Sequence, residues 1–222
     1  MRRAQRLTML KPIVEVATYA SVSPEPHSIA IDGETVWIAS RATRRIDVID
    51  RATWKKTGEI ETPGMPWGMT YGDGAIVMTC GESAEDNRRI RRFVPGGDFD
   101  AKHLECPGDT GSHLAMYNGR ILLGQWYNQK LLLLGDDGSI VRSVDSPHGI
   151  AGVAVKDGSA YIVATDDEDG GKYWITAINL ENGAAEDLAV VPFPARGLAW
   201  DGKCFWTNYR AADRTVAFRL PV

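Results

Sequence analysis

Short runs in which apolar and polar residues alternate recur along the whole chain, and Gly, Asp, Asn and Pro separate the runs. The stretch EPHSIAIDGETVWIAS, residues 25–40, contains two such runs joined by Asp32 and Gly33. Alternation with a period of two is typical of β-strands, and an Asp-Gly pair between two runs is typical of a hairpin turn. No segment combines a long helical period with capping residues, so the pattern predicts an all-β protein.

The pattern of this stretch returns four more times along the chain. The returns are MPWGMTYGDGAIVMTCG from Met65, TGSHLAMYNGRILLGQW from Thr110, SPHGIAGVAVKDGSAYIVAT from Ser146 and PARGLAWDGKCFWTN from Pro194. The five units start near residues 26, 66, 111, 147 and 195, and each reads as four short strands. Four-stranded repeats of about 40 residues are the signature of a β-propeller.

The two ends of the chain complement each other. The fifth unit stops at Val222 one strand short, while residues 13–22, IVEVATYASV, form a strand ahead of the first unit. We expect this strand to become the outer strand of the last blade, because closure of the ring leaves no blade unpaired. The prediction is therefore a single five-bladed β-propeller domain over residues 1–222, with the last blade closed by the N-terminal strand.

Composition and charge argue against several classes of function. A net charge of −4 and a pI near 5.6 argue against a general nucleic-acid binder. The basic start MRRAQR has no apolar stretch behind it, and no apolar run is long enough to span a bilayer, so we expect neither a signal peptide nor a membrane partner. Three cysteines without paired spacing indicate reduced thiols, which favours a cytoplasmic protein. For the oligomeric state, a monomer and a small homo-oligomer are both left open.

The block EPHSIAIDGETVWIASRATRRIDVID, residues 25–50, resembles one blade of the streptogramin (virginiamycin B) lyase family. It is also similar to YVTN and NHL repeat propellers and to the propeller of plant-type glutaminyl cyclases. The resemblance extends over all five units and implies the propeller fold. The lyase has seven blades, however, and its Thr-Glu pair at the end of the second strand is replaced here by AS, TC, GQ, AT and TN.

Three of the four histidines fall near the start of a first strand: His27, His113 and His148. In a propeller the first strands line the channel, and ligand sites usually occupy its mouth. An imidazole there can exchange protons with a substrate, so we predict these three residues as catalytic, with Asp166 as a partner of His148. The His148–Asp166 pair is the nearest positional analogue of the lyase family's His and Glu. The alternative is a divalent metal held by the three histidines, although no short-range metal-ligand spacing supports it and we expect no cofactor.

The remaining residues predicted at the mouth are aromatic or charged. Aromatic rings offer flat apolar walls, and arginines offer fixed positive charge for a carboxylate, phosphate or oxyanion. The predicted substrate-binding residues are Trp67, Glu82, Trp126, Tyr127, Arg196, Tyr209 and Arg210. The expected ligand is a small, anionic molecule.

Three functions are compatible with this mouth. We expect a lyase or hydrolase with His27 and His148 as acid and base and with Arg196 and Arg210 binding the anion. The first alternative is a non-catalytic propeller that binds a metabolite or another protein. The second alternative is an acyl transferase similar to glutaminyl cyclase.

Overall fold

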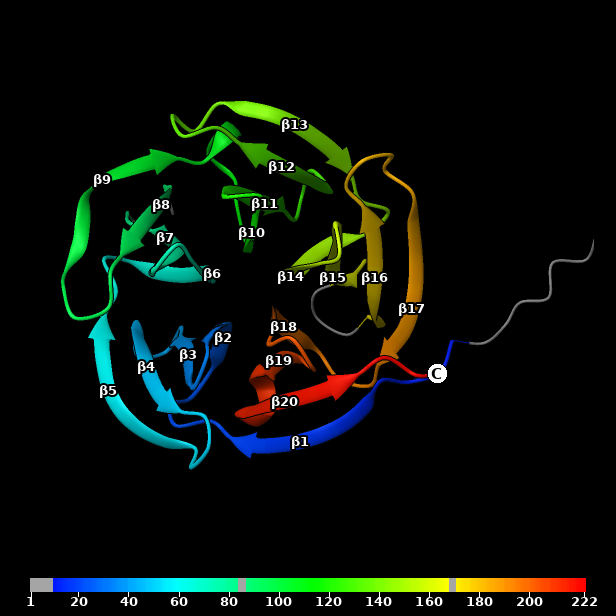
Figure 1. Cartoon of the computed structure of the whole chain (residues 1–222), viewed down its shortest axis with the longest axis horizontal. Helices are drawn as coiled ribbons and strands as arrows, with labels where there is room; N and C mark the ends of the chain where they lie inside the picture. The colour runs from blue at the N-terminus through cyan, green and yellow to red at the C-terminus, as the bar shows by residue number, and fades with distance from the viewer. Residues whose placement is uncertain (1–9, 84–86, 168–170) are drawn as a thin grey trace, which may run out of the picture.

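The computed structural model describes residues 10–83, 87–167 and 171–222. In these ranges, twenty strands form five four-stranded sheets that surround a central channel (Figure 1). The predicted all-β, five-bladed propeller is confirmed. The described residues contain no helix that is long and apolar enough to cross a membrane.

Each sheet is one blade, and its first strand lies nearest the channel (Figure 1). Blade 1 consists of β2 (Pro26–Asp32), β3 (Thr35–Ser40), β4 (Arg45–Asp50) and β5 (Lys55–Glu61). Blade 2 consists of β6 (Met65–Gly72), β7 (Ala75–Gly81), β8 (Arg88–Phe93) and β9 (Phe99–Glu105). Blade 3 consists of β10 (Leu114–Tyr117), β11 (Arg120–Gln125), β12 (Lys130–Leu134) and β13 (Ile140–Asp145). Blade 4 consists of β14 (Gly149–Lys156), β15 (Ser159–Thr165), β16 (Tyr173–Asn179) and β17 (Ala185–Val191).

Blade 5 joins the two ends of the chain. Its strands β18 (Ala195–Trp200), β19 (Phe205–Tyr209) and β20 (Arg214–Arg219) are completed by β1 (Val14–Ala20), which pairs antiparallel with β20. The predicted closure by the N-terminal strand is therefore confirmed (Figure 1). Just before β1, the backbone of Lys11 and Ile13 also bonds to Val190 at the outer strand of blade 4.

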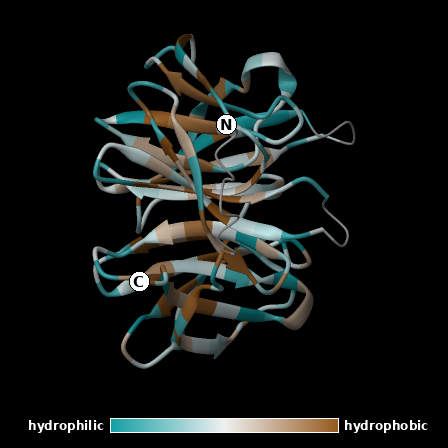
Figure 2. Cartoon of the chain, turned by 90° about the vertical axis from the view of Figure 1, so that its right-hand side faces the viewer, coloured by the Kyte–Doolittle hydropathy of each residue, from teal (hydrophilic) through white to brown (hydrophobic). Residues whose placement is uncertain are grey.

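The core lies between neighbouring blades rather than inside any one of them. Trp37 of blade 1 contacts Phe93 of blade 2 with ring centroids 6.4 Å apart, and Tyr161 of blade 4 contacts Phe205 of blade 5 at 4.9 Å. Apolar residues follow the strands, and polar residues gather at the loops (Figure 2). Since each sheet buries both faces against its neighbours, the inner strands carry nearly continuous apolar runs.

A recurring irregularity shapes the mouth, the end of the channel where the first strands begin and the second strands end. The pairing of the first two strands skips one residue there, namely His27 in blade 1, Trp67 in blade 2 and Ala151 in blade 4. Such a β-bulge redirects the extra residue's side chain and is common next to functional sites. Blade 3 has the same two-to-one arrangement, since Gly124 accepts a bond from the Ser112 N–H and donates one to the His113 carbonyl.

Candidate functional site

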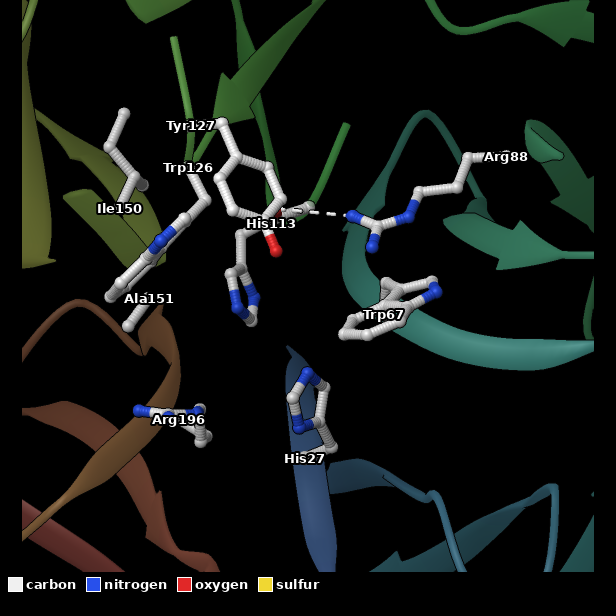
Figure 3. Close-up of a pocket in the computed structure, with 10 residues that line it drawn as sticks. His27, Trp67, Arg88, His113, Trp126, Tyr127, Ile150, Ala151 and Arg196 are labelled. Atoms are coloured by element: carbon white, nitrogen blue, oxygen red, sulfur yellow. Dashed lines mark hydrogen bonds between the residues drawn. The ribbon is translucent and has the colours of Figure 1, made fainter. Parts of the chain in front are cut away.

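A pocket of about 50 Å³ opens at the mouth, and all five blades contribute to it (Figure 3). Its walls combine imidazole, guanidinium and indole groups with a few small or apolar side chains. They are His27, Trp67, Arg88, Ser112, His113, Trp126, Tyr127, Ile150, Ala151 and Arg196. None of the described residues in this set carries a carboxylate, so the lining offers donors and positive charge.

His27 is held in one orientation and one tautomer. The bulge at the start of β2 places its side chain in the pocket, where the residue is only 1% exposed. The Arg210 guanidinium lies 3.1 Å from His27 Nδ1. Because a guanidinium can only donate, Nδ1 is the acceptor, and the proton of the neutral ring is on Nε2. The Nε2 atom is buried and has no hydrogen-bond partner, so a donor is left unsatisfied beside the pocket.

His113 fills the middle of the mouth. Its ring stacks on that of His27 with centroids 5.5 Å apart, and the two rings face each other in the pocket (Figure 3). Counted back along the hairpin, His113 occupies the position that Ser28, Gly68 and Gly152 hold in other blades. Small residues at this position let the inner strands approach closely, and the single large side chain extends into the space that they leave.

Both histidines are neutral at physiological pH. Burial, the largest cause, and the charges of Arg196, Arg88 and Arg210 together lower the pKa of His113 from 6.5 to about 3. Burial also lowers the pKa of His27 well below 6.5, and so do the neighbouring His113 and arginine charges. An anion in the pocket would reverse the effect of the arginines and make both rings more basic.

The arginines approach the pocket from two sides. Arg196 is 3% exposed, and its Nη1 donates to the Tyr173 hydroxyl at 2.7 Å and to the Ala195 carbonyl at 3.0 Å. On the opposite side, Arg88 Nη1 donates to the Gly111 carbonyl at 2.7 Å. These bonds hold both guanidinium groups in place before any ligand arrives, which favours preorganised binding of an oxyanion.

Trp67 forms the wall between the histidines and the arginines. Its ring contacts that of His27 edge to face at 5.6 Å, and Arg88 lies over it with 3.8 Å between the guanidinium carbon and the ring centroid. Arg41 lies over the same ring at 4.5 Å. Trp126 and Tyr127 line the pocket from blade 3, and Tyr127 is 78% exposed. The predicted aromatic and arginine lining is thus present at Trp67, Trp126, Tyr127 and Arg196, whereas Arg210 contributes through its bond to His27.

The structure separates His148 from the other two histidines. Its ring stacks on Trp174 at 4.8 Å, its Nδ1 lies 2.7 Å from Asp166 Oδ1, and its Nε2 lies 3.5 Å from Asp187 Oδ2. The predicted His148–Asp166 pair therefore forms, but His148 does not line the pocket. The interpretation of His148 as the counterpart of His27 is wrong, because the strand pairing places Ala151, three residues later, at the position of His27.

Two other predicted substrate-binding residues also lie outside the pocket. Glu82 bonds to Arg91 at 2.7 and 2.8 Å, and this interaction holds the pKa of the carboxyl below its usual range. Tyr209 stacks on Phe193 at 4.9 Å. Among the described residues, no group of three His, Cys, Asp or Glu side chains could hold a metal ion, so the three-histidine metal site does not form. Burial raises the pKa of the Cys80 thiol to about 12, which removes it as a nucleophile.

Sequence reasoning missed three of the lining residues: Arg88, Ile150 and Ala151. Arg88 begins the third strand of its blade, whereas we expected contributions only from the first strand and from the end of the second. The four arginines of the segment RRIRR, residues 88–92, were the available signal. Ile150 and Ala151 were missed because the PHGIA segment was aligned three residues out of register.

Comparison with known proteins defines the class of protein through its fold. No protein-family model matches the sequence, and no curated protein matches it significantly. Among solved structures, the chain is similar to a glutaminyl cyclase from Myxococcus xanthus, with a TM-score of 0.70 and 11% identity over 96% of this chain and 99% of the other. It is also similar to the PQQ-bound aldose sugar dehydrogenase of Streptomyces coelicolor, with a TM-score of 0.58 and 14% identity over 94% and 98% of the two chains.

At these identities the likeness shows the propeller fold alone. The two neighbours are propeller enzymes and not streptogramin lyases, so the resemblance noted in the blade sequences extends only to the fold.

Proposed function

We propose that the protein is an enzyme of lyase or hydrolase type that acts on a small anionic carbonyl compound at the channel mouth. The observation that carries this proposal is His27 Nε2, a buried donor without a partner beside a pocket whose described lining contains no carboxylate. Leaving such a donor unsatisfied costs about 1–3 kcal/mol, which an acceptor oxygen of a ligand would recover. A carboxylate or a developing oxyanion is the acceptor that the neighbouring arginines also favour.

In this proposal His27 is a hydrogen-bond donor rather than the general base. Its proton is on Nε2 because Arg210 donates to Nδ1, so the ring points an N–H at the oxygen that gains charge in the transition state. Arg196 and Arg88 stabilise the same charge. A neutral imidazole is well suited to this task, since it need not lose a proton to act.

His113 is then the proton acceptor. It is the second imidazole of the pocket, and its pKa is low in the empty site because of burial and the arginine charges. A bound anion offsets those charges and raises the pKa of His113 toward the range in which it can accept a proton from a substrate carbon or from water. The oxyanion and the imidazolium that form together then stabilise each other.

The test is a thermal-shift and turnover screen of small carboxylic acids, lactones and amides. We expect at least one carboxylate to raise the melting temperature of the wild-type protein, and the His27→Ala variant to lose that shift and any turnover. His103→Ala is the matched control, since His103 is on the outer strand β9 and bonds to Glu105 at 2.8 Å. A ligand shift that survives in His27→Ala would reject the proposal.

A second candidate is acyl transfer of the glutaminyl cyclase kind. It is supported by the extent of the structural match, which covers 96% of this chain and 99% of the Myxococcus xanthus enzyme. The same oxyanion-binding groups would serve an amide carbonyl. A peptide that begins with glutamine belongs in the screen, and ammonia release from it would favour this candidate.

Binding without turnover of any compound would favour a metabolite-binding propeller.

A further inference from the structure

A second, larger cavity lies beside the central pocket, between blades 1 and 2. It has a volume of about 580 Å³, and its lining includes Arg41, Arg44 and Glu82 together with the backbone around Gly64 and Gly81. Trp67 lines this cleft and the central pocket alike. The two cavities are therefore neighbours on the same face of the molecule, with one indole ring as their common wall.

The sizes of the two cavities indicate that each would hold a different part of one ligand. The central pocket, at about 50 Å³, holds a few water molecules or one carboxylate, and it is too small for a whole metabolite. Sites for small organic ligands usually measure about 300–1,000 Å³, a range that includes the cleft. A substrate whose acid group enters the central pocket must place its remaining atoms elsewhere, and the cleft across Trp67 offers the room.

The charges in the cleft favour a second acid group. Glu82 is engaged by Arg91 at 2.7 Å and by Arg89 at 3.4 Å, so its charge is already balanced. The Arg41 guanidinium lies over Trp67 at 4.5 Å, and its Nε atom is buried without a hydrogen-bond partner. An anionic oxygen placed against Arg41 would satisfy that donor by a charge-assisted hydrogen bond.

We propose that the pocket and the cleft form one elongated site for an organic acid with two acidic ends, a dicarboxylate or its equivalent. One acid group binds at His27 and Arg196, the carbon chain crosses Trp67, and the other acid group binds at Arg41. The inference rests on the proposed function for the first group, and Arg41 becomes the residue that selects for the second.

Isothermal titration with acetate and with dicarboxylates of increasing length, from malonate to suberate, tests this arrangement. We expect one chain length to bind the wild-type protein about tenfold more tightly than acetate, as a charge-assisted pair adds roughly 1.4 kcal/mol or more. Arg41→Gln should abolish that gain and leave acetate binding unchanged, whereas Arg41→Lys should retain part of it. Arg45→Gln is the control, because Arg45 is paired with Glu59 and does not line either cavity.

The possible failures are distinguishable. If acetate binding depends on His27 but no dicarboxylate binds more tightly, the second subsite is rejected and the proposed function stands. If Arg41→Gln weakens the binding of acetate and of dicarboxylates equally, Arg41 belongs to the central pocket and the division into two subsites is rejected. If neither acetate nor any dicarboxylate binds, both proposals are rejected.

Discussion

A single β-bulge decides what His27 can do. Without the skipped position in β2, the alternation of the strand would turn the ring from the pocket toward the neighbouring blade. With it, the ring lies in the pocket and Arg210, from the loop after β19, reaches Nδ1. Position and tautomer are therefore set by two elements that are far apart in the sequence, and each is needed for Nε2 to present its proton.

Buried neutral histidines make the stability of the protein dependent on pH. The unfolded chain binds a proton at His113 near pH 6.5, but the folded protein does so only near pH 3, so folding releases a proton between these values. The free energy of unfolding must then fall as the pH is lowered through this window, by about 2 kcal/mol at pH 5 for His113 alone. Denaturant unfolding between neutral pH and about pH 5 measures the fall.

The variant His113→Gln isolates this contribution, since glutamine carries no charge at any of these pH values. We expect a shallower dependence of stability on pH than in the wild-type protein, and no change in His103→Gln, where the ring is on an outer strand. If the free energy of unfolding changed with pH equally in the wild type and in His113→Gln, the assignment of His113 as a buried neutral ring would be contradicted.

At the scale of the strands, register explains both the success and the failure of sequence reasoning. The period-two runs and hairpin turns predicted the blades, since alternation and Asp-Gly turns are local properties. The match between PHSIA and PHGIA is also local, but pairing with the second strand aligns His27 with Ala151 and leaves His148 beside Trp174. Identity at four of five positions cannot reveal a three-residue offset, because the offset depends on partners in another strand.

The sequence also predicted part of the candidate site. His27, Trp67 and Arg196 were found because all three lie near the start of a first strand, a position that the repeats reveal. Arg88 was not, because its side chain crosses from the third strand to Gly111 of the next blade. Such a contact depends on how two blades pack, which no repeat pattern encodes.

The inner strands pack so closely at Gly152 that a side chain there should destabilise the protein. A Cβ atom at this position would lie 2.6 Å from the backbone carbon of Gly197, which cannot move without shifting the next blade. We expect Gly152→Ala to destabilise the protein by about 1–3 kcal/mol, the usual range for overpacking. Gly58→Ala in the outer strand β5 is the control, because its new Cβ would meet only Val48 at 3.8 Å and should change stability by about 0.5 kcal/mol or less. Equal melting temperatures for the two variants would contradict the close packing of the inner strands at Gly152.

On the scale of the whole molecule, the ring depends on the strand that completes blade 5. The pairing of β1 with β20 joins segments about 200 residues apart, and the bond from Ile13 to Val190 extends the same segment onto blade 4. Without β1, strand β20 becomes an exposed edge. We expect a chain that begins at Ser21 to lose several kcal/mol of stability and to aggregate.

Addition of a synthetic peptide with the sequence of residues 10–22 provides the internal check on that expectation. The peptide should pair with the free edge and restore the melting temperature in a concentration-dependent manner. A scrambled peptide should have no effect. Full stability of the shortened chain without any peptide would show that β1 is dispensable.

The pocket draws side chains from every blade, and this has a consequence for how the molecule responds to its ligand. A compound that touches His27, Trp67, His113 and Arg196 bridges four blades at once, so it binds only the ring in its closed form. The ligand therefore stabilises the same closed ring that the pairing of β1 with β20 completes. A higher ligand concentration should make opening of the ring rarer, so hydrogen exchange at β1 and β20 should slow when the mouth is occupied.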